Sequence, residues 1–191
     1  MGTDTRDAIV RTAARLFQTR GYNGFSYAHI AEALGVKPAA IHYHFRGKSD
    51  LGVAVAERFR ERWRRFCASA ASASPQDRLL ALHDVYLRLA ERRLSCPIAV
   101  VHAELDAVPE PVRASAIEVL EECVTWLEEA LEAGRAAGDF RFEGEARARA
   151  LVLLSLAQGS LQLARTQGLE VFNATRERLV ADLVGATKED A

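Results

Sequence analysis

The stretch GFSYAHIAEALGVKPAAIHYHFRGK, residues 24–48, decides the fold. Ser26 is a favourable residue to cap a short helix, and Gly35 is a favourable residue to end it. Pro38 suits the first turn of the next helix, where its missing N–H costs nothing. Two short helices joined by Leu-Gly-Val have the spacing of a helix-turn-helix, because the glycine lets the chain reverse while the flanking apolar residues pack together.

The second of these helices has one apolar edge. Ile41 and Phe45 are four residues apart and therefore lie on the same face, which we expect to be buried. The remaining side chains are left largely outside, namely Lys37, Ala39, Ala40, His42, Tyr43 and His44. A helix held from behind in this way can enter a groove of DNA. The alternative for Tyr43 and His44 is packing against the preceding helix.

The rest of the chain is also predicted to be helical. Residues with helical periodicity occupy about 5–20, 49–70, 76–94, 97–106, 111–136, 145–166 and 170–185. Ser49 is expected to cap the helix that follows the helix-turn-helix. We predict an all-α protein of about nine helices, with a three-helix DNA-binding domain at 1–48 and a helical ligand-binding and dimerisation bundle at 49–191.

Charge is unevenly distributed along the chain. The formal net charge is −1, yet residues 1–65 carry 12 Lys and Arg against 6 Asp and Glu, a local charge of +6. The remaining residues carry −7. A basic block of this size favours a polyanionic partner, and a solvated basic surface is the alternative.

The segment GYNGFSYAHIAEALGVKPAAIHYHFRGKSDLGVAV, residues 21–55, resembles the TetR family of transcriptional repressors. The resemblance implies a repressor that binds a double-stranded operator and is released by a small-molecule effector. By position, it implies phosphate contacts from Ser26, Tyr27, Lys37, Tyr43, His44 and Lys48. It implies contacts near base edges from Ala28, Pro38, Ala39, Ala40 and His42. Ala28 stands where other members carry a polar or basic residue.

A short recognition helix binds weakly alone, so we expect a homodimer that reaches two half-sites of a palindrome, roughly 34–36 Å apart. Residues 150–164, ALVLLSLAQGSLQLA, carry no charge and are expected to face both the chain's own core and a second copy. Residues 112–134 have an apolar stripe that could join this interface. The stripe comprises Ala116, Val119, Leu120, Cys123, Leu127, Ala130 and Leu131. The alternative for it is a core helix with a solvated acidic face.

An effector pocket is expected between the DNA-binding domain and the dimer interface. Its candidate lining is Phe59, Trp63, Phe66, Tyr86, Cys96, His102 and Trp126, with plain core packing as the alternative for each. Cys96 precedes Pro97 at a predicted helix start, where the helix dipole favours thiolate. A repressor that senses electrophiles or oxidants through Cys96 is therefore an alternative to release by a bound ligand.

Other classes of protein are disfavoured. We find no glycine-rich phosphate loop, HExxH, GxSxG or paired carboxylates, so we predict no enzyme and no cofactor, with a helical enzyme or scaffold as the rival class. Three separated cysteines, and two histidines at i and i+2 that point apart, predict no metal site. No secretion signal or membrane span is evident, and we expect a cytoplasmic protein.

Overall fold

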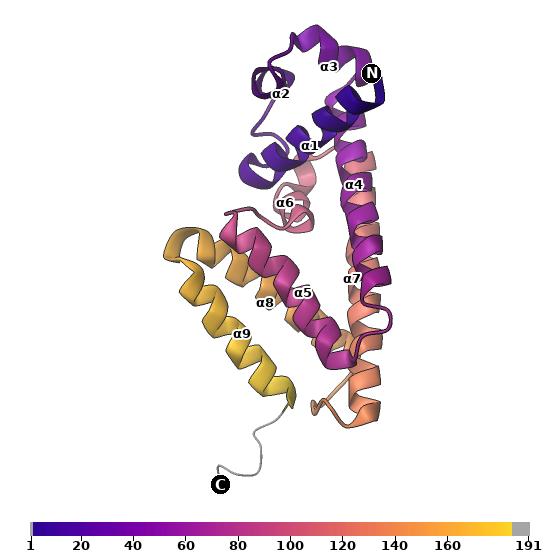
Figure 1. Cartoon of the computed structure of the whole chain (residues 1–191), viewed down its shortest axis with the longest axis vertical. Helices are drawn as coiled ribbons and strands as arrows, with labels where there is room; N and C mark the ends of the chain where they lie inside the picture. The colour runs from indigo at the N-terminus through magenta and orange to yellow at the C-terminus, as the bar shows by residue number, and fades with distance from the viewer. Residues whose placement is uncertain (1, 185–191) are drawn as a thin grey trace. The chain divides into compact units, whose positions relative to one another are not determined.

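The computed structural model describes residues 2–184 and places them in helices joined by short connections (Figure 1). The helices are α1 (Gly2–Arg20), α2 (Tyr27–Leu34), α3 (Pro38–His44), α4 (Lys48–Ser69), α5 (Pro75–Glu91), α6 (Pro97–Ala103), α7 (Glu110–Ala137), α8 (Ala146–Gln167) and α9 (Leu169–Val184). A 3₁₀ turn, η1 (Leu105–Ala107), lies before α7. These residues contain no strand, which confirms the predicted all-α class. The predicted end of the last helix at residue 185 lies outside the described residues.

The start of α4 differs from the prediction. Ser49 lies inside the first turn of the helix, which begins at Lys48. The backbone N–H of Gly47 donates to Oδ2 of Asp50 at 3.1 Å. Asp50, at the third helical position, thus reaches back to the backbone N–H of the residue before the helix, and the expectation that Ser49 caps the helix is corrected.

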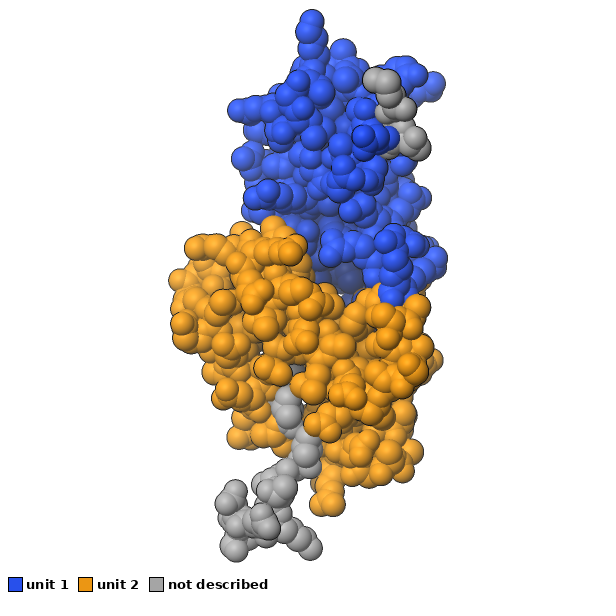
Figure 2. Space-filling view, in the orientation of Figure 1, with its two compact units in different colours: residues 1–65, 96–120 blue, residues 66–95, 121–191 orange. Residues whose placement is uncertain are grey.

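The chain divides into two compact units, coloured separately in Figure 2. Unit 1 comprises residues 1–65 and 96–120, and unit 2 comprises residues 66–95 and 121–191. Helices α4 and α7 contribute residues to both. The domain boundary predicted at residue 48 separates a DNA-binding part from a ligand-binding part. The two units are defined by packing, so this functional boundary stays a prediction.

Unit 1 is built on a core that α1, α2 and α3 share with parts of α4, α6 and α7. Ile9 and Ile30 are fully buried, as is Ile41 of α3. Gly52 of α4 allows a close approach to α7, because a Cβ at that position would lie 2.7 Å from Cγ2 of Val112. The small helices of the unit are thus held by side chains that come from distant parts of the sequence.

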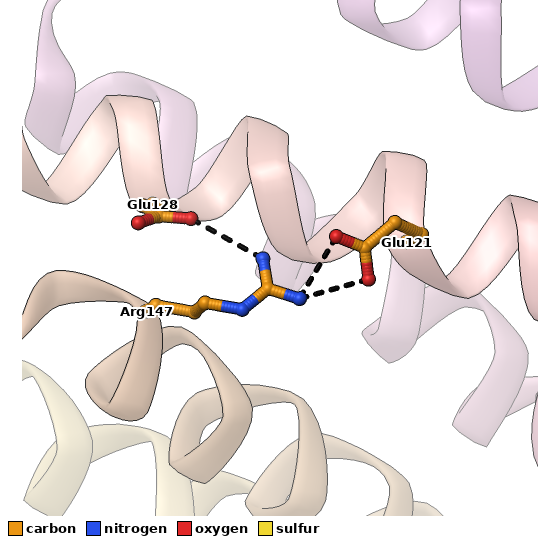
Figure 3. Close-up of polar contacts among 3 residues, drawn as sticks. All are labelled: Glu121, Glu128 and Arg147. Atoms are coloured by element: carbon orange, nitrogen blue, oxygen red, sulfur yellow. Dashed lines mark hydrogen bonds and ion pairs between the residues drawn. The ribbon is translucent and has the colours of Figure 1, made fainter.

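Unit 2 is organised around α8, which packs against α5 and α9. Leu161 of α8 is fully buried and Phe172 of α9 is 2% exposed. Figure 3 shows a polar clamp at the start of α8, where Arg147 donates to both carboxylate oxygens of Glu121 at 2.8 Å. The same guanidinium reaches Glu128, two turns further along α7, at 3.4 Å.

The apolar stripe of α7 is covered within the single chain. Val119, Cys123, Leu127 and Leu131 are between 0 and 6% exposed. A side chain already covered by its own chain has no surface left for a partner. For these four side chains the expectation of a dimer interface is therefore corrected in favour of the alternative, a core helix with a solvated acidic face, whereas Leu120 of the stripe is half-buried.

Candidate nucleic-acid interface and effector cavity

The turn between α2 and α3 is fixed by backbone hydrogen bonds. Gly35 has φ +66°, the left-handed conformation that ends α2, and its N–H donates to the carbonyls of Ala31 and Glu32. The N–H of Val36 donates to Ala31 at 3.0 Å. At the other end of α2, the N–H of Ser26 donates to Nδ1 of His29 at 3.0 Å. Ser26 is the N-cap residue of α2, as predicted, and the side chain of His29 satisfies its backbone N–H.

Helix α3 is anchored by its apolar edge and open on the other side. Ile41 is fully buried and Phe45 is 4% exposed. Tyr43 is 86% exposed, so its packing against α1 is excluded. Of the other predicted contact residues on this segment, Lys37, Pro38, Ala39 and His42 are exposed, and Ala40 and His44 are half-buried.

Two polar aromatic contacts order the exposed face. The ring of Tyr43 meets His44 edge-on with centroids 5.1 Å apart. His42 meets the ring of Tyr27, from α2, at 4.7 Å. The face therefore presents hydroxyl and imidazole groups in fixed positions, which can donate hydrogen bonds to phosphate oxygens or base edges.

Tyr27 and Lys48 hold the helix-turn-helix together from its flank. The Tyr27 hydroxyl donates to the carbonyl of Phe45 at 3.2 Å, and burial raises the pKa of Tyr27 to about 12. Nζ of Lys48 donates to the carbonyl of Phe25 at 2.5 Å and lies over the rings of Tyr22 and Phe25. Burial lowers the pKa of Lys48. Both groups have a structural role here, and their phosphate contacts stay predictions.

Ser26 and Ala28, the other two predicted DNA contacts, are exposed at the start of α2. Sequence reasoning missed a further basic group beside this surface. The guanidinium of Arg6, from α1, lies 5.0 Å from the centre of the Phe45 ring at the end of α3. Nothing in the sequence around an exposed arginine of the first helix indicates that it lies beside the end of α3.

A second missed residue, Glu104, binds the loop after α1. Its carboxylate accepts from the N–H of Tyr22 at 3.1 Å and from the N–H and side-chain amide of Asn23, both at 3.0 Å. Glu104 follows the last residue of α6. One carboxylate therefore satisfies three donors and fixes α6 to the loop that leads into the helix-turn-helix. Some 80 residues separate the partners, so no local pattern could indicate the contact.

A cavity within unit 2 is bounded by α5, α7, α8 and α9. Its wall is mainly apolar, including Leu80, Leu127 and Leu153, and the space inside it that a water-sized molecule can occupy is about 70 Å³. Three polar residues, Gln76, His83 and Arg176, also line it. A concave apolar wall with a few convergent polar groups is typical of a small-molecule site.

The seven predicted ligand residues are not brought together in this cavity. Tyr86 lines it, whereas Phe59 lines a smaller cavity inside unit 1. The rings of Phe66 and Trp126 pack on each other at 5.3 Å. The other three are Trp63 and His102, which are half-buried, and Cys96, which is buried.

Comparison with known proteins identifies the family. The model described as "Bacterial regulatory proteins, tetR family" matches residues 9–55, and the one described as "Tetracyclin repressor-like, C-terminal domain" matches residues 75–177. The chain belongs to the TetR family. It is a transcriptional regulator with an N-terminal helix-turn-helix DNA-binding domain and a C-terminal ligand-binding domain.

Individual TetR-family relatives are similar over most of their length. The HTH-type transcriptional regulator LmrA of Bacillus subtilis is 26% identical over 173 residues, 85% of this chain and 87% of that protein. The HTH-type transcriptional repressor NemR of Escherichia coli is 26% identical over 164 residues, 82% of both. A TetR-family regulator from Agrobacterium tumefaciens superposes with a TM-score of 0.92 at 27% identity, covering 97% of this chain and 100% of that one.

Within this TetR-family chain, Cys96 occupies the position expected from the sequence. It is the N-cap residue of α6, directly before Pro97 in the first turn. Its side chain is 5% exposed, so a thiol reagent reaches it only when the surrounding helices move. The sensor role of Cys96 stays a prediction.

The described residues contain neither a candidate metal site nor a helix that could span a membrane. No group of three or more His, Cys, Asp or Glu side chains is placed to hold a metal ion among residues 2–184. Within the same residues, every helix is too short or too polar to cross a membrane.

Proposed function

We propose that this regulator is a homodimeric repressor that binds a palindromic operator through α3 and is released when a small molecule occupies the cavity of unit 2. The observation that carries the proposal is the two-sided character of α3, with Ile41 fully buried and Tyr43 86% exposed. A helix fixed from behind and open in front is what insertion into a major groove requires. The repressor NemR is similar over most of its length, which supports repression rather than activation.

The proposed DNA contacts are those that the resemblance to the TetR family implies by position. Phosphates are bound by Ser26, Tyr27, Lys37, Tyr43, His44 and Lys48, and base edges lie against Ala28, Pro38, Ala39, Ala40 and His42. Alanine offers no hydrogen bond, so Ala39 and Ala40 read a thymine methyl group or permit close approach. Sequence discrimination through hydrogen bonds therefore falls mainly to His42.

Helix α8 supports the homodimer. Leu151, Val152, Leu156 and Leu163 are 43–48% exposed along it. Val152, Leu156 and Leu163 are separated by one and then two helical turns, with Leu151 next to Val152, and the same helix buries Leu161 on its other side. A two-fold pair brings identical apolar faces together, which covers this surface without any other partner.

Release requires that the cavity and the DNA-binding surface share an element. Helix α7 carries Leu127 in the cavity wall and continues into unit 1, where Val112 packs at Gly52 of α4. Helix α4 in turn begins directly after the helix-turn-helix, so a shift of α7 or α4 alters the spacing of the two recognition helices. A coupling of about 1–3 kcal/mol between ligand and operator gives roughly 5- to 150-fold release.

This role involves no chemical turnover, and we propose no catalytic activity or cofactor. Operator binding places the protein in the cytoplasm, with the chromosome.

Selection of bound duplexes from a random pool tests the proposed function. We expect an enriched palindrome, two chains per duplex, and an affinity whose log-log salt slope is about −0.9 per phosphate contact. Tyr43→Ala should lose affinity, while Thr19→Ala, an exposed change on α1 outside the predicted surface, should not. A pool that enriches no sequence, or equal affinity of both variants, contradicts the proposal.

Thiol sensing through Cys96 is the alternative mode of release, supported by its place at the start of α6. N-ethylmaleimide is then expected to release operator from the parent and not from Cys96→Ser. Cys67 serves as the internal comparison, since burial raises the pKa of its thiol to about 11. If the Cys96→Ser protein releases DNA as readily as the parent, the thiol alternative is wrong.

A further inference from the structure

The cavity of unit 2 carries one fixed positive charge and no negative one. Arg176 of α9 lines it, and no Asp or Glu lines it among the described residues. The described residues form no ion pair with this guanidinium. Arg176 is half-buried, and a charge partly removed from water is stabilised by an anionic partner. The wall therefore favours an anion and disfavours a cation.

His83 of α5 adds an unsatisfied polar group to the same cavity. Both ring nitrogens are buried, and neither has a hydrogen-bond partner among the described residues. Oδ1 of Asp84 lies 3.8 Å from Nδ1, which is longer than a hydrogen bond, and Asp84 does not line the cavity. The ring packs against Phe172 at 4.8 Å and is held in place by that contact.

Arg176 and His83 line the same cavity. Burial and the charge of Arg176 lower the pKa of His83, against an opposing effect of Asp84. The imidazole is thus neutral at pH 7 and retains one N–H donor. One permanent charge and one neutral donor suit a monoanion better than a phosphate dianion.

We propose that the effector is an amphipathic carboxylic acid whose carboxylate binds Arg176 and His83 and whose apolar chain or ring lies among the leucines of the cavity. This inference rests on the proposed function, because it names the chemical class of the molecule that releases the operator. A wholly apolar ligand would leave both polar groups unsatisfied, which costs more than an empty, solvated site. The carboxylate of an acid satisfies both polar groups, and its hydrocarbon part is buried against the apolar wall of the cavity.

Calorimetric titration of the full chain with matched compounds tests the class of ligand. The probes are hexanoate, octanoate and decanoate, with the corresponding primary amides and amines. The best acid is expected to bind about tenfold or more tightly than its amide, because hydrogen bonds to a charged group contribute more than neutral ones. The amine is expected not to bind. Equal affinity of acid and amide at every chain length overturns the proposal.

Two substitutions locate the carboxylate. Arg176→Gln should remove the preference for acid over amide, whereas Arg178→Gln, an exposed change on the same helix, should keep it. His83→Phe keeps an aromatic ring against Phe172 and should weaken binding of the acid. This second variant tests the proposal even if Arg176→Gln fails to fold. An unchanged preference in both cavity variants overturns the proposal.

Operator binding, measured separately by fluorescence anisotropy, distinguishes this inference from the proposed function. Duplex binding without a preference for acids rejects the effector class and leaves the repressor role standing. A preference for acids without duplex binding rejects the repressor role and leaves the cavity assignment standing.

Discussion

The two units differ in how their polar groups are satisfied. In unit 1, the Glu104 carboxylate accepts three hydrogen bonds, and the hydroxyl of Tyr27 and the ammonium of Lys48 each reach a carbonyl. In unit 2, His83 has two buried nitrogens without a partner, and Arg176 lines an apolar cavity. Among its described residues, unit 1 has no buried side-chain nitrogen or oxygen without a hydrogen-bond partner. Unit 2 has a site whose polar groups a ligand can complete.

The largest effect is expected from the anchor of α3. Ile41→Ala removes a fully buried side chain and should lower the free energy of unfolding by about 2–5 kcal/mol, as measured by urea denaturation. Tyr43→Ala, two residues away and 86% exposed, should leave stability nearly unchanged while it abolishes operator binding. Equal losses of stability in both variants would mean that α3 has no separate buried and functional sides.

The next effect tests whether unit 1 depends on its satisfied polar groups. Glu104→Ala removes the acceptor of three hydrogen bonds, one of them part-buried, and should cost about 0.5–1.5 kcal/mol of unfolding free energy, since the exposed Asn23 donors can bind water. Operator affinity should fall as well, because the loop before α2 is released. Asp106→Ala, at an exposed position on η1, is the control and should change stability by less than about 0.5 kcal/mol.

The unsatisfied imidazole of His83 in unit 2 predicts that its substitution increases stability, opposite to the loss expected for Glu104. His83→Phe should raise the free energy of unfolding by about 0.5–2 kcal/mol in the absence of ligand, because a buried polar group without a partner is removed. A destabilised His83→Phe protein would show that the imidazole is already satisfied in the free protein.

His83 also predicts a pH dependence. Its folded pKa lies below the ordinary value of 6.5, so the unfolded chain binds the proton more readily. Stability is therefore fully present above about pH 6.5 and declines as the pH falls toward the folded pKa. Thermal melts of the parent and of His83→Phe, compared between neutral and mildly acidic pH, should differ most at the acidic end.

The smallest effect concerns Cys67, which belongs to the part of α4 in unit 2. Burial raises its pKa to about 11, with a further contribution from the charge of Glu122. Alkylation by iodoacetamide, followed by mass spectrometry, should be very slow at pH 7 and accelerate about tenfold per pH unit up to that pKa. Rapid labelling at pH 7 would contradict this assignment.

The sequence was sufficient where local spacing controls the structure. Ile41 and Phe45 were predicted to be buried because they are four residues apart on a helix, and both are buried. Gly35 was predicted to end α2 because it tolerates a left-handed conformation, and it has φ +66°. These features depend on neighbours within one or two turns.

Features that depend on tertiary packing were not predictable in the same way. His83 and Arg176 are brought to one cavity only because α5 and α9 pack in the same unit, and neither residue was a candidate. Periodicity shows that one face of α7 is apolar but not what covers it, so the sequence left both a partner and the chain's own core as its cover. In the folded chain Leu127 and Leu131 of that stripe are buried.

Hydrogen–deuterium exchange of the free protein and of its complex with a selected operator tests the central claim most directly. The account predicts new protection of amides in residues 26–48, centred on α3, together with retained protection around the buried Ile41 in both states. Tight duplex binding without added protection of α3 would contradict the assignment of this helix as the one that reads DNA.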